Sequence, residues 1–177
     1  MLFIYLALSA LLIYGFVLLL RSLTLRKVVR DYQVGLLYKN GKLQKQLGAG
    51  AYWLNPLRSE LIIVDKRRVT TVVAGQEVTT QDNVGLKVNA TISYEVDDAQ
   101  KAIRSVQSYA DELYFIVQLA LREELSSQPI DALLENRQSL GDLLTERVAP
   151  QAQELGLKLH SIQIRDFMFA GDLKRAF

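Results

Sequence analysis

The 177-residue sequence contains no cysteine, a single histidine, one tryptophan and three prolines. Without cysteine, the chain forms no disulfide and offers no thiolate as a nucleophile or metal ligand. With His160 as its single imidazole, a histidine-based zinc site or a Ser–His–Asp triad is difficult to assemble. We therefore predict a protein that is not an enzyme and that uses neither a cofactor nor a metal.

The net charge is also small, because 21 Lys and Arg residues are balanced by 19 Asp and Glu residues, which leaves +2. Four cations close to the N-terminus account for more than this excess: Arg21, Arg26, Lys27 and Arg30. The remainder is near neutral, which gives no electrostatic basis for a nucleic-acid partner. Beside an apolar segment, the four cations are better interpreted as the flank of a membrane anchor, where they also favour anionic lipid headgroups.

One long apolar run is present, Leu2 to Leu20 (LFIYLALSALLIYGFVLLL), and it contains no charged residue. As a helix it would be about 28 Å long, close to the roughly 30 Å hydrocarbon core of a bilayer. The run predicts a transmembrane anchor over residues 1–21, followed by a basic juxtamembrane segment over residues 22–30. The lipid bilayer is thus the first predicted partner.

A cleaved signal peptide and a buried core helix are the alternatives to an anchor. A signal peptide would have a basic segment before its apolar run and a small-x-small cleavage site after it, whereas Arg21-Ser22-Leu23 follows here. A helix that is apolar on every face would need to be covered on every face. Because the cations follow the run, the positive-inside rule predicts an external N-terminus and a cytoplasmic body, in a single-pass protein of the plasma or inner membrane.

Short extended segments follow the basic residues. Asp31–Lys39 alternates in polarity, and Asn40-Gly41 separates it from the extended run Lys42–Leu47. Asn-Gly between two such segments predicts a hairpin with a type I′ turn, because both residues accept positive φ. Tyr52–Leu54 predicts an aromatic strand, and two interpretations of Tyr52 and Trp53 stay open. They contact the membrane surface, which favours both side chains, or they form one side of a small β core.

Three further strands are predicted in this half of the chain. Leu61–Val64 is continuously apolar, which is typical of a strand buried on both faces. Val69–Val73 is β-branched and is expected to end at Ala74-Gly75. Val84–Val96 is the clearest strand, since six alternate positions are apolar: Leu86, Val88, Ala90, Ile92, Tyr94 and Val96. This pattern predicts a sheet with one packed and one solvated face.

After Asp97 the apolar period changes to that of helices. Asp98 is expected to cap a helix reaching about Val106, and Ser108–Leu125 predicts a longer helix whose stripe is widened by Tyr114 and Phe115. Glu123 and Glu124 point about 100° apart on that helix, which favours a solvated face over a shared acid–base site.

A third helix is expected to begin at Pro129, to kink or restart at Pro150, and to end at Gly156. Leu157–Ile164 then returns to a strand in which His160 shares a face with Ile162 and Ile164. Asp166–Phe169 is expected to leave this strand, and a further helix is expected to start at Gly171-Asp172.

The predicted class is α+β, in which an anchor precedes a β-rich lobe over residues 31–96 and a helical α/β lobe over residues 97–177. In this order the chain resembles the stomatin/slipin branch of the SPFH (band-seven) family. The motifs that carry the resemblance are Tyr32–Leu36, Asn40–Lys42, Gly50–Tyr52, Asp65–Arg67, Gln76–Val84, Tyr94–Asp98, Gln118–Arg122, Leu133–Arg137, Gly156-Leu157, Ile164–Asp166 and Ala170–Lys174. Within them the family-motif positions are Gln76, Thr80, Asp82, Tyr94, Arg122, Arg137 and Asp166.

The resemblance implies an SPFH domain in a non-catalytic membrane scaffold that self-associates into a ring or cage and organises membrane microdomains. It also implies partners such as a membrane protease, a channel or another integral membrane protein. Similar proteins continue into a long helical coiled coil, which this sequence lacks. One alternative is a dedicated regulator of a membrane protease with the opposite topology. A membrane-bound hydrolase is a minor alternative, because no GxSxG, HExxH or SxxK motif is present.

Overall fold

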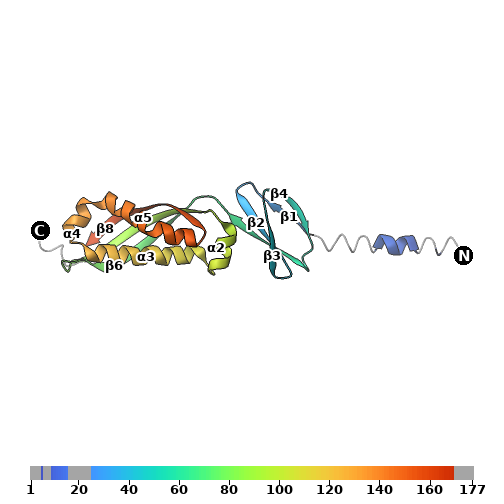
Figure 1. The fold of residues 1–177 in the computed structure, drawn as a ribbon, viewed down its shortest axis with the longest axis horizontal. Helices are drawn as coiled ribbons and strands as arrows, with labels where there is room; N and C mark the ends of the chain where they lie inside the picture. Colours follow the sequence, from blue (N-terminus) through green and yellow to red (C-terminus); the bar gives the residue numbers. More distant parts are fainter. Residues whose placement is uncertain (1–4, 6–8, 16–24, 170–177) are drawn as a thin grey trace. The chain divides into compact units, whose positions relative to one another are not determined.

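The computed structural model describes residue 5, residues 9–15 and residues 25–169. Residues 9–15 are helical and exposed, and the remainder of the predicted span Leu2–Leu20, apart from Tyr5, lies outside the described residues. Among the helices that are described, none is both long and apolar enough to cross a membrane. The helix predicted from Gly171 also lies outside them. The chain divides into two compact units, unit 1 over Met1–Asp65 and unit 2 over Lys66–Phe177 (Figure 1).

Unit 1 is built from two small antiparallel sheets. Its strands are β1 (Leu25–Val29), β2 (Gln33–Lys39), β3 (Lys42–Leu47), β4 (Gly50–Leu54) and β5 (Ser59–Asp65). β1 pairs with β4 in a two-stranded ribbon, and the other three form a sheet in the order β3-β2-β5. The predicted hairpin between β2 and β3 is confirmed, since Asn40 and Gly41 have φ values of 51° and 76°.

The core of unit 1 is small. Its buried apolar side chains are Val29, Leu36, Leu47 and Val64. Gly35 of β2 lets the ribbon approach the sheet, because a Cβ at this position would lie 3.1 Å from Cγ2 of Val29 in β1. The prediction that Leu61–Val64 is buried on both faces is wrong. Ile63 is 40% exposed, whereas its neighbour Val64, on the other face of the strand, is buried.

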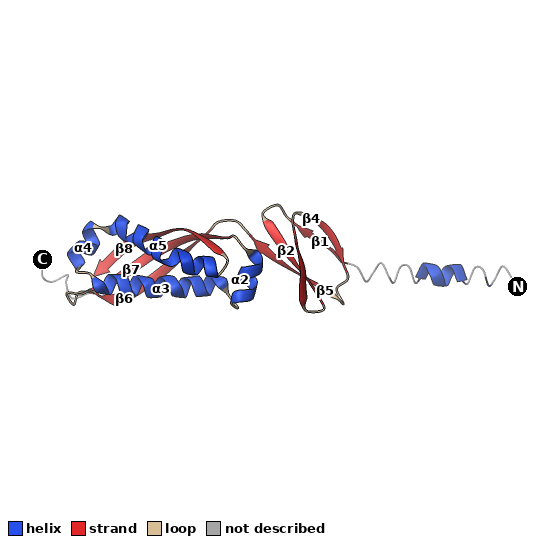
Figure 2. Cartoon of the chain, viewed as in Figure 1, coloured by secondary structure: helices blue, strands red, loops and turns tan. Residues whose placement is uncertain are grey.

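Unit 2 is a three-stranded antiparallel sheet with helices on one face (Figure 2). Its elements are β6 (Val69–Thr79), β7 (Gly85–Val96), α2 (Ala99–Ser105), α3 (Tyr109–Ser127), α4 (Ile130–Glu135), α5 (Arg137–Glu154) and β8 (Leu157–Phe169). β7 lies between β6 and β8, and the six alternate apolar residues predicted for it are all buried. The predicted strand Val84–Val96 is thereby confirmed.

Two strands of unit 2 are longer than predicted, because β-bulges accommodate extra residues without ending the strand pairing. β6 does not end at Ala74-Gly75. The register shifts between Val73 and Gln76, and Gly75 adopts a φ of 70°. β8 likewise continues through Asp166 to Phe169, pairing with the first half of β7. The expected exit of Asp166–Phe169 from the strand is therefore wrong.

The cap at Asp98 follows the prediction, whereas two helix boundaries do not. Oδ1 of Asp98 accepts the Lys101 amide at 3.0 Å, and Ser108 caps α3. The helix predicted from Pro129 is broken at Asn136 into α4 and α5. At Pro150 the helix does not restart, since α5 continues through it to Glu154.

The division of the chain also differs from the predicted lobes, which met at Val96. β6 and β7 belong with the helices because β7 pairs with β8 along its whole length. Gly156, with a φ of 76°, joins α5 to β8 and accepts amides of Asp97 and Asp98 through its carbonyl. The strand before the helices and the strand after them thus form one sheet.

Candidate functional site

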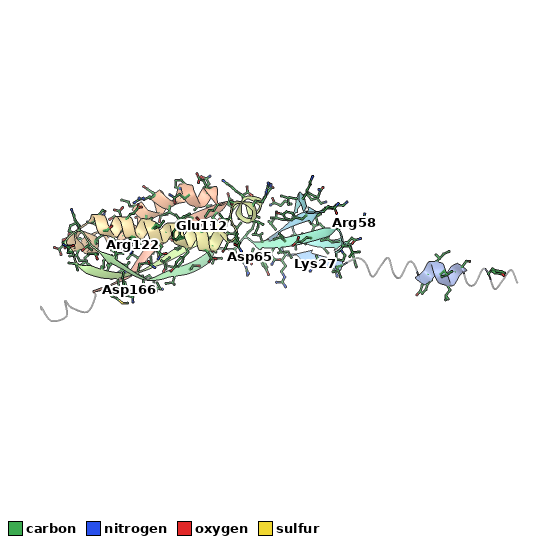
Figure 3. The ribbon with its side chains drawn as sticks, turned by 90° about the horizontal axis from the view of Figure 1, so that it is seen from below. Lys27, Arg58, Asp65, Glu112, Arg122 and Asp166 are labelled. Atoms are coloured by element: carbon green, nitrogen blue, oxygen red, sulfur yellow. The ribbon has the colours of Figure 1, made fainter. Side chains whose placement is uncertain are left out.

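A mixed apolar and basic surface lies on the β1–β4 ribbon of unit 1. We call it the ribbon surface. Its residues are Leu25, Arg26, Lys27 and Val28 of β1, Trp53 of β4, and Leu57 and Arg58 of the following turn, all exposed. Lys27 and Arg58 are labelled in Figure 3. Trp53 is 69% exposed and Leu57 is 77% exposed, although both are large apolar side chains.

Strand alternation explains why Arg26, Val28 and Trp53 point outward, whereas Leu25 and Lys27 are exposed on the other face of the ribbon. Val29 is buried, so its face of β1 is the packed one, and Arg26 and Val28 belong to the opposite face. Trp53 pairs directly with Arg26 across the ribbon. Directly opposed residues of an antiparallel pair lie on the same face, and therefore Trp53 shares the outward face with Arg26 and Val28.

The turn after β4 is held by several hydrogen bonds. The side chain of Asn55 accepts the Leu57 amide at 2.9 Å, and its carbonyl accepts the amides of Arg58 at 3.2 Å and Ser59 at 2.9 Å. The carbonyl of Arg58 accepts the Asn40 amide at 3.0 Å, which ties the turn to the β2–β3 hairpin. The turn therefore presents Leu57 from an ordered backbone.

The structure separates the two aromatic residues predicted for the membrane surface. Tyr52 is half-buried, and its hydroxyl donates to the Gly48 carbonyl at 3.0 Å. Trp53 is exposed on the opposite face. Among the predicted basic residues, Arg26 and Lys27 lie on the ribbon surface, Arg30 donates to the Tyr32 hydroxyl at 2.7 Å, and Arg21 lies outside the described residues. Sequence reasoning missed Leu57 and Arg58, whose one signal was the Asn-Pro turn just before them.

Two of the family-motif positions, Thr80 and Asp82, form a latch inside unit 2. Thr80 is buried, and its hydroxyl donates to Oδ1 of Asp82. Oδ2 of Asp82 accepts the Ile130 amide at the start of α4 at 3.3 Å. The hydrogen bond from Thr80 holds the pKa of Asp82 below its usual value of 3.8, partly opposed by desolvation. The latch joins the β6–β7 hairpin to α4, so its role is structural.

Arg137 closes the outer edge of β8 together with two other residues of α5. Nε of Arg137 donates to the Ile164 carbonyl at 2.8 Å, and Oγ1 of Thr145 accepts the Ile162 amide at 2.8 Å. Between them Gly141 packs so closely that a Cβ there would lie 2.7 Å from the Ile162 oxygen. Because the Ile164 carbonyl and the Ile162 amide are already bonded to α5, they cannot pair with a further strand at this edge.

The other family-motif positions have diverse surroundings. Gln76 accepts from the Gln118 side chain at 2.7 Å, which joins β6 to α3. Tyr94 is buried in β7, and burial raises the pKa of its hydroxyl, with a further contribution from Tyr109. Arg122 and Asp166 are exposed (Figure 3). The structure does not bring the seven positions together into one site.

His160 belongs to a charged cluster on the solvated face of the sheet. A bulge makes it an extra residue of β8 between Leu159, opposite Tyr94, and Ser161, opposite Ser93. The prediction that it shares the face of Ile162 and Ile164 is therefore wrong.

Both ring nitrogens of His160 have close neighbours. Nε2 lies 3.0 Å from Oε2 of Glu95, and Nδ1 lies 3.1 Å from a guanidinium nitrogen of Arg68. His160, followed by Lys158 and Arg68, lowers the pKa of Glu95. In the described part of the chain, no three His, Cys, Asp or Glu side chains gather as a metal site.

A groove of about 300 Å³ lies between α3 and α5 on unit 2. Phe115 and Leu119 line it from α3, and Arg147 and Val148 line it from α5. Phe115 was expected to widen the buried stripe of α3. Instead it is 52% exposed, because the neighbouring positions Leu113 and Val117 occupy the face toward the core. At the rim, Arg147 pairs with Glu123 and lies 3.7 Å from Glu124.

The sequence matches a known family over most of both units. The SPFH domain / Band 7 family matches residues 27–177, which include both units after the start of β1. The chain belongs to the SPFH/band 7 family. This membership confirms the resemblance drawn from the motifs.

Individual SPFH relatives are distant in sequence. An uncharacterised protein of Archaeoglobus fulgidus is 30% identical over 84% of this chain and 60% of its own length. A stomatin homologue of Pyrococcus abyssi is 29% identical over 85% of this chain and 56% of its own length. Mouse stomatin is 24% identical over 85% of this chain and 54% of its own length. The chain thus spans little more than half the length of these three relatives.

Proposed function

We propose that this chain is a non-catalytic, membrane-anchored scaffold of the stomatin/slipin type. It self-associates laterally, organises membrane microdomains and modulates neighbouring membrane proteins such as a protease or a channel. The observation that carries the proposal is the order of the chain, in which an uncharged apolar run and a basic flank directly precede a band 7 domain. A segment of this length and apolarity is that of a membrane span.

Lateral association calls for a surface on the body, and the α3–α5 groove supports this role. Phe115 and Leu119 expose apolar area on its wall, while the rim carries Glu112 and the Arg147–Glu123 pair. An apolar centre with a charged rim is the usual composition of a protein interface. A ring needs two different patches that meet, so the groove would receive another region of the neighbouring subunit.

Extraction in mild detergent followed by size analysis tests the assembly. We expect the full chain to float with membranes, to resist alkaline extraction, and to elute as an oligomer. Phe115→Asp is expected to shift the oligomer toward monomer. Gln107→Asp, which adds the same charge to an exposed position before α3, is expected to leave the size unchanged. A monomer for the unaltered chain would contradict the scaffold proposal.

Topology is tested separately with a reporter fused after Phe177. By the positive-inside rule, the positive charges after the apolar run favour a cytoplasmic body, so we expect a reporter that works in the cytoplasm to be active. Activity on the opposite side alone would overturn this orientation and favour a regulator of a membrane protease with its body outside.

A further inference from the structure

We infer that the ribbon surface is a docking surface for anionic phospholipid headgroups, with Trp53 and Leu57 entering the interfacial layer of the bilayer. The inference rests on the proposed function, since it requires a chain that resides at the membrane. It adds a second membrane contact, made by the folded body and selective for lipid charge. Three features of the ribbon surface carry it.

The first feature is the kind of apolar residue exposed. Trp53 and Leu57 are the most exposed large apolar side chains described between residues 25 and 169, and Val28 adds to them on the same ribbon. Tryptophan favours the layer between lipid headgroups and acyl chains, because its ring is apolar and its indole N–H is polar. Such residues clustered on one small unit mark an interaction surface.

The second feature is charge of one sign. Residues 25–30 and 50–59, which form the ribbon and its turn, contain Arg26, Lys27, Arg30 and Arg58 and no Asp or Glu. Arg26 lies directly opposite Trp53, so a cation and an aromatic ring project side by side from the same face of the ribbon. Near an anionic bilayer, each added cation strengthens binding about fivefold. Lys27 lies on the other face of the thin ribbon, still within a Debye length of the same bilayer surface, so the three exposed cations Arg26, Lys27 and Arg58 would together favour contact by about 100-fold.

The third feature is the position of the ribbon along the chain. β1 begins five residues after Leu20, the end of the apolar run, and five extended residues reach at most about 18 Å. A ribbon tethered so closely to the bilayer meets headgroups at a high effective concentration. The hydrogen-bonded turn at Asn55 presents Leu57 already ordered, which lowers the entropic cost of docking.

Trp53 is the single tryptophan of the sequence, so its fluorescence reports this contact directly. The full chain would be reconstituted into phosphatidylcholine vesicles with and without phosphatidylglycerol, and flotation would verify insertion. With phosphatidylglycerol we expect a blue-shifted Trp53 emission and strong quenching by lipids brominated near the headgroup. In phosphatidylcholine alone, or at high salt, quenching is expected to be several-fold weaker.

Two triple variants that each remove three positive charges distinguish an effect of the ribbon surface from an effect of the net charge of the protein. Arg26→Gln, Lys27→Gln and Arg58→Gln together are expected to reduce quenching in anionic vesicles to the level of phosphatidylcholine. The control combines three exposed cations elsewhere, changed to glutamine in the same way, and is expected to behave like the unaltered chain: Lys45, Arg104 and Arg165. Unchanged circular dichroism would show that each variant is folded.

Several results would overturn the inference while leaving the scaffold proposal intact. One is a chain that floats with vesicles but whose Trp53 is not quenched by brominated lipid. Equal quenching in both lipid compositions would exclude selectivity for anionic lipid. Protection of Trp53 from aqueous acrylamide without lipid quenching would show that a protein, or a second copy of this chain, covers the ribbon. Failure to float at all is the distinct result that contradicts the proposed function itself.

Discussion

The two units of this protein use apolar residues in opposite ways. In unit 2 the six alternate apolar side chains of β7 and the core-facing stripe of α3 are buried, although Phe115 and Leu119 of α3 are exposed in the groove. Among the described residues of unit 1, four apolar side chains are buried, whereas Trp53 and Leu57 are exposed to solvent. Both units belong to one family domain, yet one directs its apolar surface inward and the other displays much of it.

The difference indicates that unit 2 contributes more to stability, whereas unit 1 presents a surface for interaction. Burial of apolar area is the main favourable contribution to folding, so unit 2 has the larger source of stability. Unit 1 is small and keeps a large apolar and basic surface exposed, which costs it stability that a better-buried arrangement would have. An exposed surface of this kind is retained where it contacts something, and the membrane is the nearest candidate.

The largest expected effect comes from removing equal volumes from the two cores. Leu36 in unit 1 and Leu121 in unit 2 are both fully buried, and replacing either with alanine is expected to cost about 3 kcal/mol. Leu36→Ala truncates one of the four buried apolar side chains in β1–β5, so we expect it to abolish the cooperative transition of unit 1. Leu121→Ala is expected only to lower the midpoint of unit 2.

Two probes distinguish these outcomes in denaturant titrations of the detergent-solubilised chain. Protease resistance of the backbone between residues 25 and 65 reports unit 1, and helical ellipticity reports mainly α3 and α5 of unit 2. If Leu36→Ala kept a sharp transition in protease resistance while Leu121→Ala lost its ellipticity transition, the ranking of the two cores would be reversed.

A smaller effect is expected where α5 closes the edge of β8. Gly141→Ala would place a Cβ 2.7 Å from the Ile162 oxygen, so helix and strand must separate, at a cost of about 2 kcal/mol to unit 2. Gly48→Ala is the matched control in unit 1, since a Cβ there meets nothing within 4 Å. Thermal unfolding followed by ellipticity measures the first change. An unshifted midpoint for Gly141→Ala would show that the contact at Ile162 is not close.

The Thr80–Asp82 latch is expected to make unit 2 sensitive to acid. The pKa of Asp82 is lower in the folded state than its usual 3.8, so the carboxylate stabilises the fold above that value. This contribution is lost as the pH falls through the lowered pKa. Asp82→Asn should therefore be less stable than the unaltered protein at neutral pH, and the difference should shrink in acid.

Denaturant midpoints of unit 2 measured across the acidic range test the latch. Thr80→Ser keeps the hydroxyl donor to Asp82 and is expected to preserve the acid dependence. A difference between the unaltered protein and Asp82→Asn that stays constant with pH would exclude Asp82 as the titrating group.

The smallest effect is expected at Trp53. Because the side chain is 69% exposed, Trp53→Ala should change the stability of unit 1 in the detergent-solubilised chain by less than about 0.5 kcal/mol. Protease resistance of the backbone between residues 25 and 65 would measure this. A large loss of resistance would assign Trp53 to a core, in agreement with the second interpretation of the aromatic strand.

Much of unit 2 was predictable because its signals are local. The alternation in β7 requires one buried face whatever its neighbours are, and Asp98 and Ser108 cap their own helices. The Asn40-Gly41 turn follows from the positive φ that these two residues tolerate. The motifs also predicted the family, since their order along the chain is itself a sequence property.

The features that escaped prediction depend on pairing between distant segments. The bulges in β6 and β8 arise where each strand must match β7, and they move His160 toward Glu95. The break at Asn136 separates α4, which the Asp82 latch holds, from α5, which lies along β8. Periodicity within one segment carries no information about its partner.

The sequence by itself determined the kinds of element, their order, and an apolar run followed by four cations, because these depend on residues close together in the chain. Only the tertiary structure decided which side chains face outward. Tyr52 and Trp53 are neighbours of the same chemical type, yet the buried Val29 of the paired strand directs one inward and the other to solvent. Burial is a property of the assembled sheets, and this is why the ribbon surface emerges only once the chain has folded.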